Sequence, residues 1–67
     1  MDVNELLEKA IGKKVRIILR NKKNEIIDDY TFNNFQGGFV NEFSKYNYFH
    51  AFISCLTHTL IIELKEK

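Results

Sequence analysis

The spacing of the apolar residues changes at Gly12, and this change constrains the fold more than any other feature of the sequence. Upstream of Gly12 the apolar residues recur at the spacing of one face of an α-helix. Asp2 followed by Glu5 resembles a capping box, and Gly12 suits the left-handed position that ends a helix. The sequence therefore predicts a helix over about residues 2–11, whose apolar face consists of Val3, Leu6, Leu7, Ala10 and Ile11.

Downstream of Gly12, apolar and polar residues alternate, which is the pattern of half-buried β-strands. The polar stretch 21–24 predicts a hairpin turn, because Asn21 and Asn24 tolerate a positive φ angle. In the strand before this turn Val15, Ile17 and Leu19 point one way and Lys14, Arg16, Ile18 and Arg20 the other, and in the last strand Leu60, Ile62 and Leu64 lie opposite to Ile61 and Glu63.

Further strands follow the turn in regular succession, separated by short polar or glycine-containing segments. The second strand alternates on both sides, and a bulge near Asp28 and Asp29 would give it one consistent inward face. The strands after the turn are expected at about residues 25–33, 39–43, 46–50 and 59–64, and residues 51–56 either continue the strand before them or form one helical turn.

This order of elements predicts a mainly β fold, in which a short N-terminal helix precedes a five-stranded antiparallel barrel of the SH3-like or Sm-like type over about residues 13–65. A chain of 67 residues buries only about 60% of the surface that it exposes when unfolded. We therefore expect a single domain over residues 1–67 with one small core, and we expect Ile18, Phe35 and Ile61 on the outer face of the barrel. A core this small also leaves a homodimer or a hetero-complex open.

The charge balance and the cysteine content limit the classes of function. The formal net charge is only +1, so any attraction to nucleic acid must come from a local group of cations. Cys55 is the single cysteine, which excludes an internal disulfide and favours a reducing compartment. Because the sequence has no signal peptide and no apolar run of membrane-spanning length, it predicts a cytoplasmic protein.

The motif "IGKKV" and the C-terminal segment "SKYNYFHAFISCLTHTLIIEL" match the pattern of a known family. The matching residues of the C-terminal segment are Tyr46, Tyr48, Leu56, Thr57, Thr59, Glu63 and Leu64. In these parts the chain resembles the Veg family of small bacterial proteins, which implies an SH3-like barrel and a non-enzymatic regulatory role linked to biofilm genes. The opening "IGKKVRIILRNKKNEI" also resembles the first hairpin of Sm-like RNA-binding proteins.

A group of cations on the first strand and its turn is the candidate nucleic-acid site. Several phosphates could contact this group, with nearby tyrosines stacking on unpaired bases of single-stranded RNA or DNA. The alternative is that the cations pair across the hairpin with Glu25, Asp28 and Asp29, and such pairs contribute only about a few tenths of a kcal/mol each. The group consists of Lys14, Arg16, Arg20, Lys22 and Lys23.

Three tyrosines form the candidate protein-binding site. A tyrosine offers a partner a large contact area and a hydroxyl group, so a groove lined by tyrosines suits protein recognition. The alternative is that most aromatic residues of so small a chain belong to its core, including Phe49 and Phe52 of the densest aromatic segment. The candidates are Tyr30, Tyr46 and Tyr48.

Metal binding and catalysis find little support in the sequence. Cys55 and His58 form a lone C-x-x-H pair, whereas a zinc site needs a second pair of ligands. Cys55 is therefore expected to be a small buried apolar residue. The sequence predicts a non-enzymatic module without a cofactor that recognises a protein partner. A nucleic-acid-binding regulator and a phage- or plasmid-type inhibitor of a partner protein are the alternatives.

Overall fold

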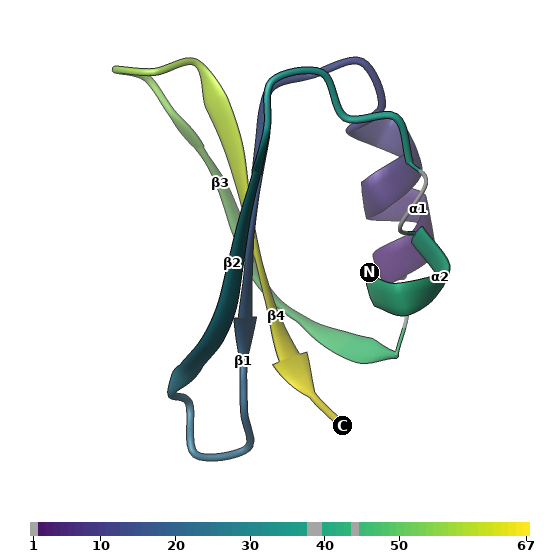
Figure 1. The fold of residues 1–67 in the computed structure, drawn as a ribbon, viewed down its shortest axis with the longest axis vertical. Helices are drawn as coiled ribbons and strands as arrows, with labels where there is room; N and C mark the ends of the chain where they lie inside the picture. Colours follow the sequence, from purple (N-terminus) through teal and green to yellow (C-terminus); the bar gives the residue numbers. More distant parts are fainter. Residues whose placement is uncertain (1, 38–39, 44) are drawn as a thin grey trace.

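The computed structural model describes residues 2–37, 40–43 and 45–67, in which four strands form one mixed sheet. The strand order is β2-β1-β4-β3, and both helices lie on one side of the sheet (Figure 1). Neither of these helices has the length and apolarity needed to cross a membrane. The elements in chain order are α1 (Val3–Lys9), β1 (Val15–Arg20), β2 (Ile26–Phe32), α2 (Val40–Phe43), β3 (Tyr46–Ser54) and β4 (Thr59–Glu66).

The predicted N-terminal helix is present as α1, and local interactions define both of its ends. The Asp2 carboxylate accepts a hydrogen bond of 3.1 Å from the backbone N–H of Asn4, as a helix N-cap does. Beyond the helix Gly12 has a φ of 84°, in the left-handed region that glycine adopts without strain. The Gly12 N–H donates to the Phe35 carbonyl at 2.7 Å, so the end of the helix is joined to the segment after β2.

The predicted hairpin turn between β1 and β2 is confirmed. The side-chain oxygen of Asn21 accepts hydrogen bonds of 2.9 Å from the backbone N–H groups of Lys23 and Glu25. Asn24 adopts a φ of 71°, which asparagine tolerates better than most residues. The pairing shifts between Leu19 and Arg20, which places a bulge close to the expected position near Asp28.

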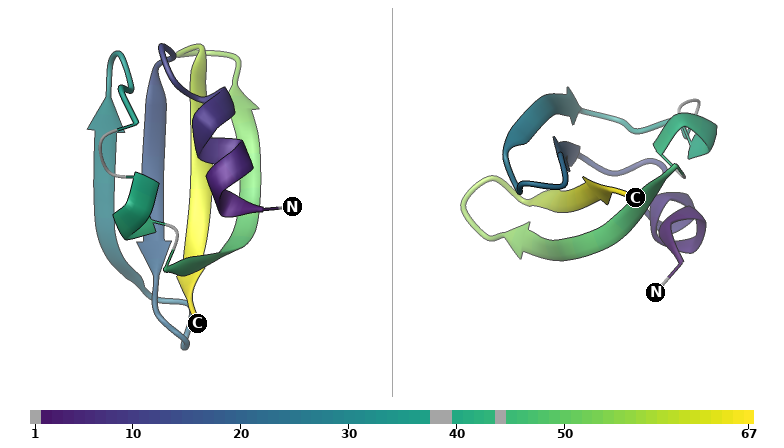
Figure 2. Two further views of the ribbon diagram at one scale, coloured as in Figure 1. Left: turned by 90° about the vertical axis from the view of Figure 1, so that its right-hand side faces the viewer. Right: turned by 90° about the horizontal axis from the view of Figure 1, so that it is seen from below.

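The prediction of a five-stranded antiparallel barrel is wrong, because β1 and β4 pair in parallel. Val15 lies beside Leu60 and Arg20 beside Lys65, so both strands run in the same direction through the centre of the sheet. After β2 the chain crosses by way of α2 to the far edge and returns from β3 to the centre as β4 (Figure 2). The Veg and Sm-like resemblances also imply a barrel, and the mixed sheet overturns this expectation for the same reason.

The predicted strand over residues 39–43 is also wrong within the residues that are described. Val40–Phe43 forms the short helix α2, while Phe39 lies outside the described residues. A helical turn here brings the Phe43 side chain into the core, where it is almost completely buried. Of the two alternatives for residues 51–56, continuation of the preceding strand is confirmed as far as Ser54, where β3 ends.

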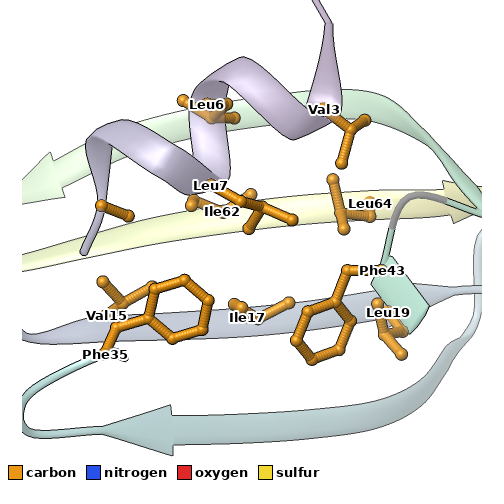
Figure 3. Packing of buried hydrophobic residues seen from close by; sticks show 11 residues of the cluster. Val3, Leu6, Leu7, Val15, Ile17, Leu19, Phe35, Phe43, Ile62 and Leu64 are labelled. Atoms are coloured by element: carbon orange, nitrogen blue, oxygen red, sulfur yellow. The ribbon is translucent and has the colours of Figure 1, made fainter. Parts of the chain in front are cut away.

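The core lies between the sheet and α1, and Figure 3 shows its side chains directed toward one another. Phe35 was expected on an outer face, but it is fully buried. Two backbone hydrogen bonds explain the difference: Phe35 N–H donates to Lys13 O at 3.0 Å, and Phe35 O accepts from Gly12. These bonds fix the segment after β2 against the α1–β1 connection. The completely buried larger side chains are Leu7, Val15, Ile17, Phe35, Ile62 and Leu64.

Candidate interaction surfaces

The side of the sheet away from the helices forms a continuous surface, which we call the uncovered face (Figures 1 and 2). Neighbouring paired residues of a sheet point to the same side, so the register assigns its members. Arg16 lies beside Ile61, and Ile61 lies beside Phe52. The members of this face include Arg16, Ile18, Arg20, Asp29, Phe49, Phe52, Ile61, Glu63 and Lys65.

Two half-exposed phenylalanines form part of the apolar surface of the uncovered face. Phe49 is 44% exposed and Phe52 is 43% exposed, although both belong to β3. The Lys65 ammonium lies 5.7 Å from the centre of the Phe49 ring, which places this ring on the same side as Lys65. The sequence placed both rings among the alternative core residues because the chain is small. The irregularity between Tyr48 and His50, which unbroken alternation does not reveal, changes the side to which the later residues of β3 point.

The Arg16 guanidinium is held by Asp29 across the β1–β2 pair. Nε donates to Oδ1 at 3.0 Å and Nη2 to Oδ2 at 2.6 Å, so the guanidinium binds the carboxylate at two points. The hydrogen bond from Arg16 lowers the pKa of the Asp29 carboxyl, opposed by partial burial, and Asp29 in turn raises the pKa of Arg16. This pair is one of those that the alternative interpretation expected, in which the cations of the hairpin pair with its acids.

The Arg20 guanidinium joins three parts of the fold. Nε and Nη2 each lie 2.8 Å from Oε1 of Glu63 in β4, and Nη1 donates to the carbonyl of Asn24 in the turn at 2.9 Å. Both charged side chains are largely buried. Arg20 therefore connects the hairpin turn to the central strand pair, and its donors are engaged within the protein.

The predicted nucleic-acid site is divided by these interactions. Lys14 precedes β1 at one end of the strand, whereas Lys22 and Lys23 lie in the turn at its other end. Arg16 and Arg20 stand between them, each bound to a carboxylate. The structure thus places the five cations along one strand but does not bring them together as one unpaired basic surface.

Two of the three candidate tyrosines share a shallow pocket of about 240 Å³ between β2, α2 and the start of β3. The Tyr30 hydroxyl donates to Oδ2 of Asp28 at 3.0 Å, and this bond raises the pKa of the phenol. The Tyr30 ring also lies 5.7 Å from that of Phe43, at the rim of the core. Tyr46 lines the same pocket, whereas Tyr48 lies further along β3 beside Leu64.

The candidate metal and nucleophile residues do not assemble. Cys55 was expected to be buried, but it is an exposed free thiol in the connection between β3 and β4. His58 lies in the same connection, and His50 lies within β3. Across the described ranges, no three histidine, cysteine, aspartate or glutamate side chains are placed to hold one metal ion.

Comparison with protein-family models, with curated proteins and with solved structures finds no match to this chain. The regulatory role that follows from the Veg resemblance therefore stays a prediction, as does RNA binding from the Sm-like resemblance.

Proposed function

We propose that this protein is a non-enzymatic interaction module that binds a protein partner through the uncovered face. The observation that carries the proposal is the pair of exposed phenylalanines, Phe49 and Phe52, on a sheet face that both helices leave open. Aromatic side chains are enriched among the residues that dominate binding energy at protein interfaces. A partner that covered both rings would remove their apolar surface from water, at about 25 cal/mol per Å².

The charges of the uncovered face favour a protein partner over a nucleic acid. Arg16 and Arg20 are each neutralised by a carboxylate on the same face, Asp29 and Glu63. Binding to nucleic acid depends on cations that displace the counterions of phosphates. A face whose arginines already have carboxylate partners has little to offer such a ligand, whereas mixed charges around an apolar centre are usual at protein interfaces.

The exposed thiol of Cys55 supports the rest of the proposal, which places the protein in the cytoplasm. A free exposed cysteine persists in a reducing compartment and oxidises readily outside it. A regulator of the Veg type and a phage- or plasmid-type inhibitor would both act by such binding. They differ in the partner, which has to be identified by experiment.

The proposal is tested by affinity capture from the source cells with three forms of the protein. The wild type should retain a partner that the double variant Phe49→Ser with Phe52→Ser does not retain. The matched control is Tyr48→Ser, because Tyr48 belongs to the same strand, is 38% exposed and is paired with Leu64 of the covered face. If Tyr48→Ser lost the partner while the double phenylalanine variant still captured it, the binding site would instead lie at the predicted tyrosines.

A titration with single-stranded RNA and DNA at two salt concentrations tests the alternative. We expect no specific binding. Tight binding that weakens steeply with salt would overturn the proposal in favour of a nucleic-acid regulator. In that case Lys22→Ala with Lys23→Ala should weaken the binding and flatten its salt slope, by about one unit for each phosphate that the variant no longer binds.

A further inference from the structure

One end of the molecule combines uncompensated positive charge with protruding apolar side chains. Three chain segments meet there: the α1–β1 connection, the segment after β2 and the β3–β4 connection (Figure 1). Residues 10–15, 33–37 and 51–62 contain no aspartate or glutamate, but they contain Lys13, Lys14 and His58. The acids that come closest to these segments along the chain are Glu8 and Glu63.

A pocket of about 270 Å³ opens at this end, and we call it the end pocket. Its lining consists of Lys13, Lys14, Ile53, His58 and Leu60. The Leu60 N–H donates to the Lys14 carbonyl at 3.0 Å, which holds the start of β4 against the segment that carries both lysines. The backbone of His58 has a φ of 51°, a left-handed conformation that is uncommon outside glycine, so the turn itself fixes where this side chain begins.

The apolar residues at this end are the most exposed large ones of the described chain. Leu56 is 96% exposed at the β3–β4 connection, and Ile53 is 68% exposed on the wall of the end pocket. Single exposed apolar residues are common and need no explanation. Here, however, Ile53 lines a pocket together with two lysines, a histidine and a leucine, and Leu56 lies two residues before that histidine in the chain.

The lysines of the end pocket have no ionic partner within the described parts of the chain. The ion pairs found there are Arg16–Asp29 and Arg20–Glu63, and both lie on the uncovered face. Two ammonium groups without a carboxylate, next to aliphatic walls, are complementary to a carboxylate beside an aliphatic side chain. A charge-assisted hydrogen bond of this kind is about twice as strong as one between neutral groups.

We propose that the end pocket binds a peptide segment in which a carboxylate adjoins a leucine-like side chain. The carboxylate would lie between Lys13 and Lys14, and the aliphatic group would cover Ile53 and Leu60. The carboxylate comes either from an acidic side chain or from the C-terminus of the partner. This site is separate from the uncovered face, and it deepens the proposed function because it states the chemistry of a protein partner.

A peptide suits the end pocket better than a nucleic acid does. Binding of a nucleic acid relies on many bound phosphates, and this end supplies two lysines. At about 270 Å³ the pocket is slightly smaller than the usual range for ligand sites, which is about 300–1,000 Å³. It therefore has room for one or two side chains, and its aliphatic walls offer nothing to a phosphate backbone.

The test is a titration of the full chain with labelled peptides of alternating glutamate and leucine, followed by fluorescence anisotropy and amide NMR shifts. One peptide is amidated at its C-terminus, a second has a free C-terminus, and a third has glutamine in place of glutamate with an amidated end. Binding of the amidated acidic peptide identifies a side-chain carboxylate. Clearly tighter binding of the peptide with the free terminus identifies a C-terminal one. We expect shifts at Lys13, Lys14, His58 and Leu60, and we expect the glutamine peptide to bind about tenfold more weakly or worse.

Charge reversal at the two ends of the molecule makes the test specific. Lys13→Glu with Lys14→Glu should weaken acidic-peptide binding by about tenfold or more, since it replaces charge-assisted hydrogen bonds with repulsion between like charges. The matched control is Lys22→Glu with Lys23→Glu, another pair of adjacent exposed lysines in the turn at the opposite end of β1. The control should change binding by less than about twofold, because screening is strong beyond about 10 Å.

Three results would overturn the end-pocket proposal: equal weakening by both charge reversals, equal binding of the glutamine peptide, or shifts confined to another surface. Displacement of the peptide by a single-stranded oligonucleotide at the same residues would replace it with a polyanion site. The double variant Phe49→Ser with Phe52→Ser separates the two proposals. This variant should still bind the peptide at the end pocket. Loss of partner capture in this variant would therefore test the uncovered face alone and not the end-pocket proposal.

Discussion

The two faces of the sheet are built from alternate residues of the same strands, yet they have different compositions. On the covered face Ile17 and Leu64 are fully buried beneath α1. On the uncovered face Ile18 is only 8% exposed without a helix above it, and it lies on β1 between the ion-paired Arg16 and Arg20. Long charged side chains of this kind bury their aliphatic stems along apolar surface. The covered face thus excludes water with a second layer, and the uncovered face does so with the stems of charged side chains. The stability of the fold should therefore depend mainly on the covered face, and partner recognition on the uncovered face.

The largest expected effect is a cavity on the covered face. Leu64→Ala should lower the free energy of unfolding by about 2–5 kcal/mol, because it removes buried methyl groups and leaves a void. Ile61→Ala in the same strand is the control on the uncovered face, where the side chain is half-buried, and should cost about 1 kcal/mol. Urea unfolding followed by circular dichroism measures both. Should Leu64→Ala fail to fold, Ile17→Val, at about 1 kcal/mol, provides the measurement. Equal losses on both faces would break the comparison.

A charged pair of the uncovered face should have the next largest effect. Glu63→Ala leaves the largely buried guanidinium of Arg20 without its carboxylate, so we expect a decrease of about 1–3 kcal/mol in the free energy of unfolding. Glu66→Ala is the control, since Glu66 is an exposed acid on the same strand and should cost less than about 0.5 kcal/mol. Indistinguishable urea midpoints of the two variants would show that Arg20 and Glu63 contribute no more than an exposed charge.

Phe52→Ser should have a modest effect on stability although it removes a whole aromatic ring. Because nearly half of Phe52 is already exposed, the variant forgoes only part of the burial free energy of a phenylalanine, about 1–2 kcal/mol. Thermal unfolding of Phe52→Ser and Tyr48→Ser provides the measurement. A destabilisation as large as that of Leu64→Ala would mean that Phe52 is a structural residue, which would weaken its assignment to recognition.

The smallest effect concerns pH and the pair of Arg16 and Asp29. The pKa of Asp29 is lowered in the folded state, so the pair stabilises the fold above the ordinary aspartate pKa of about 3.9. This contribution disappears as the pH falls through the lowered pKa of the folded state. The wild type should therefore be slightly more stable than Asp29→Asn at neutral pH and equal to it in strong acid, as measured by urea unfolding at several pH values. High salt should reduce the neutral-pH difference, and a difference that survives acid would contradict the assignment.

Several parts of the fold could be predicted because short-range interactions determine them. The helix followed from the spacing of Val3, Leu6 and Leu7 and from the cap at Asp2. The hairpin turn followed from Asn21 and Asn24, whose side chain and backbone supply its hydrogen bonds and its left-handed residue. Alternation likewise gave the correct faces for β1 and β4, because the side chains of a strand point to opposite sides in turn.

The candidate site could be predicted only in part. The pairing of Arg16 with Asp29 was among the sequence-based alternatives, since both residues lie on adjacent strands of one hairpin. The pairing of Arg20 with Glu63 was not among these alternatives. Glu63 lies far away in the chain and becomes a neighbour of Arg20 only through the β1–β4 pairing. Phe49 and Phe52 were missed for a related reason, since the irregularity in β3 and the absence of a helix above them are properties of the assembled sheet.

The sequence by itself determined that β1, β2, the first part of β3 and β4 are extended, that the segment near the N-terminus is helical, and which side of β1 and β4 is apolar. The tertiary structure alone decided that β1 and β4 are neighbours, that they run in parallel and that Phe35 is buried. The physical reason is that alternation fixes the side to which a residue points but not the strand that lies beside it. Strand pairing is chosen by interactions between distant segments, here by the crossover that leaves β4 beside β1 and one face of the sheet without a helix above it.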